Sequence, residues 1–145
     1  MILGAARHYK QYQQDDISTS SQGQLILMMY EGAIKNISMA IDCIDQKDIP
    51  GKGLHIRKTH DIINELSLAL DMEKGGDVST RLERLYQFIL SQLTLANIKS
   101  ETKILKSVLD ILKTLLDAWT EVINKQKVEE PTPPEQTLKR IASKC

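Results

Sequence analysis

The stretch Leu68-Ala69-Leu70-Asp71-Met72-Glu73-Lys74-Gly75-Gly76-Asp77 decides how this chain folds. It follows a long segment in which apolar residues have helical spacing, and another such segment begins directly after it. Two adjacent glycines favour a turn, because a residue without a side chain adopts left-handed backbone angles at little cost. The stretch therefore predicts the end of one amphipathic helix and the start of the next.

Apolar residues recur every three or four positions through most of the remaining chain, which predicts further amphipathic helices. We expect Pro50 and Gly51 to end the first helix, and Ser100 to cap the start of the fourth. All connections are short, so neighbouring helices should be antiparallel. The prediction is an all-α, antiparallel up-down four-helix bundle with an N-terminal capping segment. Its helices are expected over residues 22–47, 52–72, 77–98 and 101–127.

The helix expected over residues 101–127 has the widest apolar face. Two neighbouring heptad seams run along it, so it should pack against more than one other helix. The first seam holds Ile104, Val108, Ile111, Leu115, Ala118 and Val122, and the second holds Leu105, Leu109, Leu112, Leu116, Trp119 and Ile123.

The chain divides into three parts by composition. Residues 1–20 are expected to form an N-terminal capping segment, residues 21–127 the four-helix bundle, and residues 128–145 a Pro-rich C-terminal tail. The tail begins with a helix-breaking run around Pro131, Pro133 and Pro134. The first ten residues lack the apolar core of a signal peptide, which favours a cytoplasmic location.

Charge and composition argue against several classes of partner. Nineteen basic residues balance nineteen acidic ones, so there is no electrostatic reason to expect nucleic acid. The longest apolar run, residues 25–30, is too short to span a membrane. Only two cysteines are present, Cys43 and Cys145, and they form neither a metal-binding motif nor a disulfide framework.

The sequence offers no catalytic constellation. Its three histidines are His8, His55 and His60, and the five-residue spacing of the last two does not place them on one helical face. No nucleotide-binding loop, nucleophile elbow or zinc-protease motif is present. We therefore expect no enzyme activity, cofactor or metal. The alternative is a helical-bundle enzyme or sensor with a buried cofactor.

Binding is a better interpretation of the apolar surplus on the third and fourth helices. One explanation is that these helices are central and covered by the others. The second explanation is that part of the surface forms a groove that binds an amphipathic helix of a partner. The residues alone leave both explanations open.

Four segments in this order and spacing resemble a known family. They are the stretch over residues 68–77, Leu25 to Ile34 (LILMMYEGAI), Leu82 to Asn97 (LERLYQFILSQLTLAN) and Leu116 to Trp119 (LDAW). Together they are similar to the flagellar export chaperones that escort flagellin, the FliS family, over about residues 9–125. The tail beyond residue 127 lies outside the usual extent of that family.

The resemblance implies a cytosolic chaperone that binds the disordered C-terminal helical region of flagellin. Binding would prevent premature polymerisation and support delivery to the flagellar type III export apparatus, with an export-gate component as a further expected partner. The family's N-terminal aromatic segment corresponds here to Tyr9 and Tyr12. The other partner-binding residues that the resemblance implies are Ile62, Ile63, Leu66, Leu82, Leu85, Tyr86, Ile89, Leu93, Ala96 and Asn97.

Overall fold

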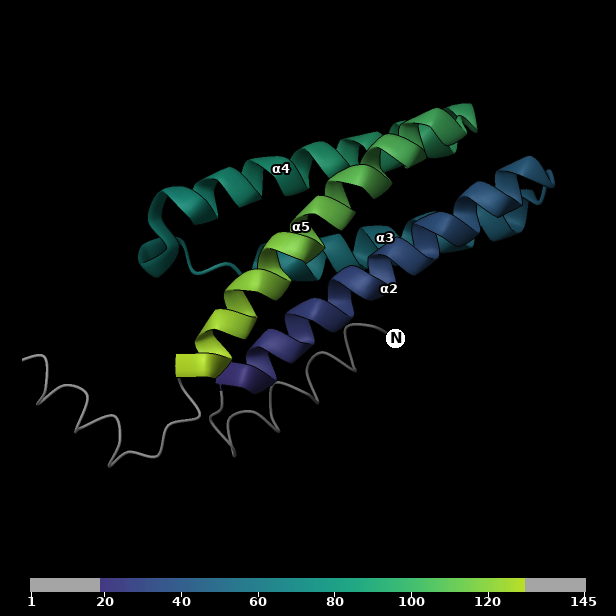
Figure 1. Ribbon diagram of the computed structural model, residues 1–145. Helices are drawn as coiled ribbons and strands as arrows, with labels where there is room; N and C mark the ends of the chain where they lie inside the picture. The colour runs from purple at the N-terminus through teal and green to yellow at the C-terminus, as the bar shows by residue number, and fades with distance from the viewer. Residues whose placement is uncertain (1–18, 130–145) are drawn as a thin grey trace, which may run out of the picture.

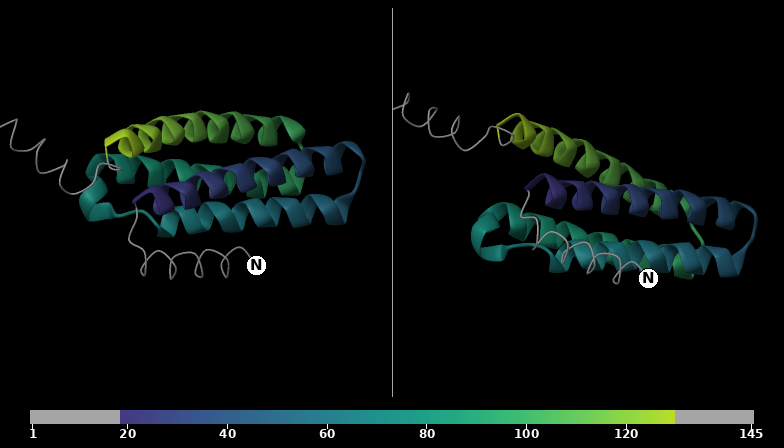
Figure 2. Two further views of the ribbon diagram at one scale, coloured as in Figure 1. Left: turned by 60° about the horizontal axis from the view of Figure 1, so that its bottom comes forward. Right: turned by 90° about the horizontal axis from the view of Figure 1, so that it is seen from below.

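The structure is a computed structural model that describes residues 19–129, including the side chains of residues 21–125. These residues form four helices, α2 (Thr19–Asp45), α3 (Ile49–Leu68), α4 (Met72–Lys99) and α5 (Thr102–Glu129). The helices lie side by side and alternate in direction (Figures 1 and 2). The predicted all-α antiparallel bundle is confirmed.

Each helix packs against two others around the bundle. α2 contacts α3 and α5, and α4 also contacts α3 and α5, while the diagonal pairs are separated. The inward residues form one continuous core, because each helix presents its apolar stripe to the same axis. The residues with no exposed surface are Tyr30, Ala33, Ile37, Ala40, Thr59, Ile63, Ile89, Leu93, Ala96, Leu105, Val108 and Leu112.

The prediction that Pro50 ends the first helix is wrong. α2 ends at Asp45, and Pro50 lies in the first turn of α3. A proline is well placed there, because the first amide groups of a helix have no intrahelical acceptor and the missing N–H costs nothing. Asp48 caps this helix, and its carboxylate accepts a hydrogen bond from the Gly51 amide at 3.0 Å.

The stretch over residues 68–77 does separate two helices, but the break lies earlier than predicted. α3 ends at Leu68 instead of Met72, and Asp71 caps α4 by accepting hydrogen bonds from the Glu73 and Lys74 amides. One helical turn follows before the chain kinks at Gly76, where φ is +52°. The glycine pair therefore bends the start of α4 and does not stop α3.

Lys52, a buried lysine of α3, stabilises the connection between α4 and α5 through hydrogen bonds. Ser100, predicted as the cap that starts the fourth helix, instead ends α4 with left-handed backbone angles. The Lys52 ammonium donates to the Asn97 carbonyl at 2.9 Å and to the Ser100 hydroxyl at 2.8 Å. A cation is favourable at a helix C-terminus, where carbonyl groups lack intrahelical partners.

At the other end of the bundle, α5 lies close to α2 and apart from α4. Gly23 of α2 is buried, and a Cβ atom at this position would lie 2.9 Å from the side chain of Ile123. The missing side chain allows α5 to approach α2 closely. Figure 1 shows the end of α5 beside the start of α2, while the first turns of α4 lie well away from both.

Leu112 tests the assignment of the core. Its side chain has no exposed surface and lies midway along α5. Replacement by alanine should lower the free energy of unfolding by about 2–5 kcal/mol, because it removes buried methyl groups and leaves a cavity. Urea unfolding measures the change, and a loss below about 1 kcal/mol would show that this position is not core.

Substitution of Gly23 tests whether α2 and α5 approach each other closely at this end of the bundle. Gly23→Leu should lower the free energy of unfolding by about 1–3 kcal/mol, because the new side chain occupies the space that Ile123 fills. The control is Gly53→Ala on α3, where an added Cβ meets nothing within 4 Å. This control should gain up to about 1 kcal/mol from helix propensity. A stabilised Gly23→Leu protein would contradict the packing described for this end.

Candidate binding site

An apolar cavity of about 220 Å³ opens at the end of the bundle where α5 separates from α4. Its walls come from all four helices and from the α3–α4 connection. The lining residues are Ile26, Leu66, Ala69, Leu70, Asp71, Gly75, Val78, Ser79, Leu82, Tyr86 and Trp119. Most of these side chains are apolar, so the cavity suits an apolar group better than a charged one.

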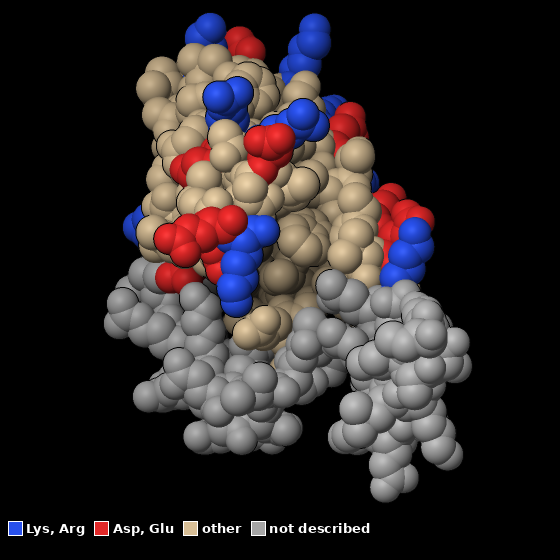
Figure 3. Space-filling view, turned by 90° about the vertical axis from the view of Figure 1, so that its left-hand side faces the viewer, with Lys and Arg blue, Asp and Glu red and all other residues tan. Residues whose placement is uncertain are grey.

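The cavity reaches the surface of the molecule. Figure 3 views the end where α4 begins and α5 finishes, and it shows a hollow among uncharged atoms with charged side chains to either side. Val78 at the cavity is 64 % exposed, and the neighbouring Met72 is 49 % exposed. Accessible apolar side chains beside an apolar hollow are typical of a binding surface.

The α3–α4 connection gives the cavity one fixed wall. The Ser79 hydroxyl donates to the Asp71 carbonyl at 2.9 Å, and Asp71 also caps the first turn of α4. A Cβ atom at Gly75 would lie 2.7 Å from the Ser79 Cβ, so a side chain at this position would force Ser79 to move. The kinked start of α4 thus has a defined position and shapes the cavity.

Three aromatic residues from three helices meet at the cavity floor. The hydroxyl oxygens of Tyr30 on α2 and Tyr86 on α4 are 2.5 Å apart, and both side chains are buried. Burial raises the pKa of Tyr30, while hydrogen bonds from Tyr86 and from Trp119 of α5 lower it in part. Burial, with Tyr30 as a second cause, raises the pKa of Tyr86 well above its ordinary value. Both phenols therefore remain neutral at physiological pH.

The structure divides the residues that the sequence assigned to partner binding. Leu66, Leu82 and Tyr86 line the cavity. Leu85 is half-buried, and Asn97 is exposed at the opposite end of α4. The other described members of the set lie in the core, with at most 3 % exposure: Ile62, Ile63, Ile89, Leu93 and Ala96. Tyr9 and Tyr12 lie outside the described residues.

Sequence reasoning missed Val78 and the α3–α4 connection as parts of the cavity. Val78 falls between the expected helix start and the first residue of the apolar stripe, so periodicity alone gave it no role. Trp119 was assigned to an apolar seam of the fourth helix. A seam specifies which residues face inward, but it cannot show where two helices separate.

Chemistry based on metal ligands has no support within the described part of the chain. Residues 19–129 contain no group of three or more His, Cys, Asp or Glu side chains that could hold a metal ion. His55 Nδ1 lies 3.0 Å from the Asn36 side-chain oxygen, a contact between α2 and α3 away from the cavity. None of the four described helices is long and apolar enough to cross a membrane.

The described residues form a four-helix bundle with an apolar cavity that opens at one end. Comparison with known proteins identifies the family. The model of the family described as Flagellar protein FliS matches residues 5–126. This chain belongs to the FliS family of flagellar secretion chaperones.

Individual relatives agree with this assignment. The flagellar secretion chaperone FliS of Vibrio cholerae is 33 % identical over 122 residues, covering 83 % of this chain and 90 % of the relative. The Bacillus subtilis protein of the same name is 31 % identical over 119 residues, covering 82 % and 88 %. A crystal structure of a bacterial flagellar chaperone has the same fold, with a TM-score of 0.70 and 21 % identity, and the match covers 83 % of this chain and 98 % of that one. Because these relatives are named as chaperones, the function is that of a chaperone and not of an enzyme.

The aromatic floor can be tested by removing single hydroxyl groups. Tyr30→Phe and Tyr86→Phe should each cost about 1–3 kcal/mol of stability, because each leaves a buried polar group without its partner. The double variant should cost less than the two single changes added together, by about 0.5–3 kcal/mol. Urea unfolding of all four proteins completes the cycle. Strictly additive costs would show that the two hydroxyls do not interact.

Proposed function

We propose that this chaperone binds the C-terminal helical region of flagellin and keeps that region from polymerising in the cytosol before export. The bound complex is then delivered to the flagellar type III export apparatus, where a component of the export gate is a further partner. Membership of the FliS family and the open apolar cavity support this proposal.

The physical basis is coupled folding and binding. A segment with too little apolar surface to fold alone remains disordered, and burial of its apolar face on another protein offsets the ordering entropy. The cavity between α4 and α5 offers such a face next to exposed Val78 and half-buried Leu82. Because the chaperone binds only the unassembled client, it protects by mass action and requires no chemical step.

We assign the first contacts to the accessible residues at the cavity mouth. Val78 and Leu82 are spaced four residues apart on α4, so a client helix can place one apolar stripe against both. Leu66 and Tyr86 lie deeper and form the floor. Ile89 and Leu93, further along α4, have no exposed surface. Direct contact with those two residues would require the bundle to open.

Val78→Asp tests the proposed site without disturbing the core. The side chain is 64 % exposed, so the variant should fold normally. Its affinity for a flagellin C-terminal segment should fall about tenfold or more, because the client would desolvate an unpaired carboxylate. Isothermal titration measures the affinity, and circular dichroism confirms the fold.

Ile98→Asp is the matched control, since Ile98 lies on the same helix near its other end and is 76 % exposed. This variant should bind as the unmodified protein does. Equal affinity of the Val78→Asp protein and the control would remove the cavity from the binding site. If the unmodified protein bound no flagellin segment, the proposed client itself would be excluded.

A further inference from the structure

We propose that the candidate site takes an amphipathic helix with carboxylates beside its apolar stripe, and that Arg81 and Arg84 of α4 bind those carboxylates. Under the proposed function this helix is the client segment, so the inference rests on that function. The supporting feature is a stripe of α4 that the bundle covers only in part. This outer stripe consists of Val78, Arg81, Leu85, Phe88, Gln92 and Leu95.

The outer stripe has the pattern of a helix-binding surface. Its members follow one another at intervals of three and four residues, so they lie on one side of α4. Val78 and Phe88 are at least 50 % exposed, while Leu85, Gln92 and Leu95 are half-buried. Apolar side chains that repeat along one side of a helix and remain accessible are typical of a surface that a partner helix covers.

The outer stripe lies on the side of α4 that α5 borders. On the other side, the Ser67 hydroxyl of α3 donates a hydrogen bond to the Glu83 carboxylate. Leu85 follows Glu83 by two residues, or about 200° around the helix, so it points away from α3. Val78, the first residue of the stripe, lines the cavity together with Trp119 of α5. The stripe therefore continues the cavity along α4.

Two unpaired guanidinium groups accompany these apolar side chains. Arg81 belongs to the outer stripe, Arg84 lies three residues further along α4, and both are exposed. Within residues 21–125 the structure has a single ion pair, between Glu121 and Lys125 of α5, so neither arginine is paired there. Asp77, one helical turn before Arg81, forms no ion pair with it. Both cations are therefore available to a partner.

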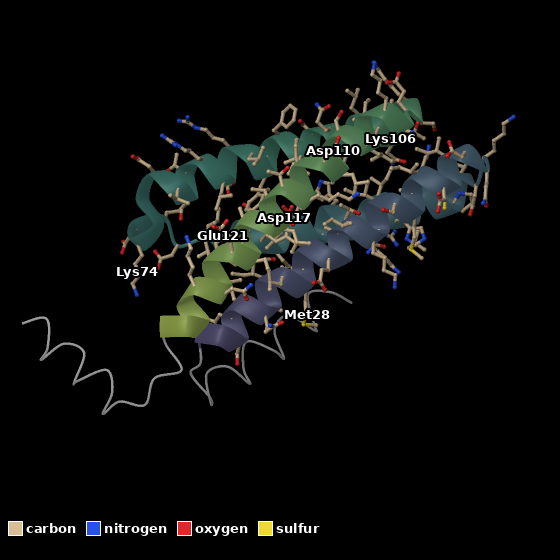
Figure 4. All side chains as sticks on the ribbon, in the orientation of Figure 1. Met28, Lys74, Lys106, Asp110, Asp117 and Glu121 are labelled. Atoms are coloured by element: carbon tan, nitrogen blue, oxygen red, sulfur yellow. The ribbon has the colours of Figure 1, made fainter. Side chains whose placement is uncertain are left out.

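The other nearby carboxylates have different positions or partners. Glu83 is hydrogen-bonded on the α3 side of the helix, and Asp71 caps the first turn of α4. On α5, Asp117 and Glu121 are each two residues from Trp119, so they lie on the face of that helix opposite the cavity. Figure 4 shows both along α5. The charges that border the outer stripe are thus mainly the two arginines.

This combination selects the charge of the bound helix. A guanidinium group can donate two parallel hydrogen bonds to a carboxylate, which favours acidic residues that flank the apolar stripe of a partner. A partner with basic flanks would place like charges together. Pairs of this kind at the rim of an interface contribute little each, so we expect the two together to give a preference of about fivefold.

Two synthetic helical peptides test the preference. They share one apolar stripe, which is flanked by glutamates in the first peptide and by lysines in the second. In isothermal titration at low salt, the unmodified protein should bind the glutamate peptide about fivefold more tightly. Arg81→Glu with Arg84→Glu should reverse the preference, which only a folded protein can do. Equal affinities for the unmodified protein, or a preference that the variant keeps, would overturn the proposal.

The matched control is Lys103→Glu with Lys106→Glu on α5. These two lysines are also exposed and three residues apart, so the change in net charge is the same. Figure 4 shows Lys106 toward the opposite end of α5 from Glu121. The control should still prefer the glutamate peptide. A reversal as large as that of the arginine variant would assign the effect to net charge and overturn the proposed contact.

Titration with a flagellin C-terminal segment separates this inference from the proposed function. Equal binding of that segment to the unmodified protein and to the arginine variant would overturn the inference and leave the client in place. A glutamate preference without any binding of flagellin would support the inference and exclude flagellin as the client. Sedimentation of the protein alone completes the test. Self-association that the arginine variant loses would assign the outer stripe to a second copy and overturn the proposal.

Discussion

The shape of this molecule depends on the contact between Gly23 and Ile123. Because Gly23 has no side chain, the end of α5 lies against the start of α2, and α5 cannot at the same time follow α4 along its whole length. Val122, from the seam that sequence analysis placed inside, is 46 % exposed.

Hydrogen bonds and helix caps hold the floor of this cavity and one of its walls in place. Tyr30, Tyr86 and Trp119 join three helices at its floor, where each buried polar atom has a partner. The capped and kinked start of α4 forms its wall. A surface held in place before a partner arrives loses little entropy on binding, so its affinity comes from the apolar area that it buries. Under the proposed function, the cost of becoming ordered falls on the client segment.

Much of this architecture can be predicted from the sequence, because helix periodicity is a local signal. The stripe through Tyr30, Ala33 and Ile37 is buried as expected. Helix ends were less predictable, since Pro50 and Gly76 are compatible both with ending one helix and with starting the next. The residues of the candidate site were least predictable. Whether Ile89 is core and Val78 accessible depends on the angle between α4 and α5, which arises from contacts distant in sequence.

The buried ammonium of Lys52 has a consequence for motion. It joins the start of α3 to the carbonyl end of α4, at the end of the bundle opposite the cavity. Lys52 therefore joins α3 to α4 at one end of the bundle, whereas α4 and α5 separate at the other end. Local opening should follow this gradient, with slow amide exchange near Asn97 and faster exchange in the first turns of α4. The end of the bundle tied by Lys52 would then act as a hinge, about which the walls of the cavity move apart.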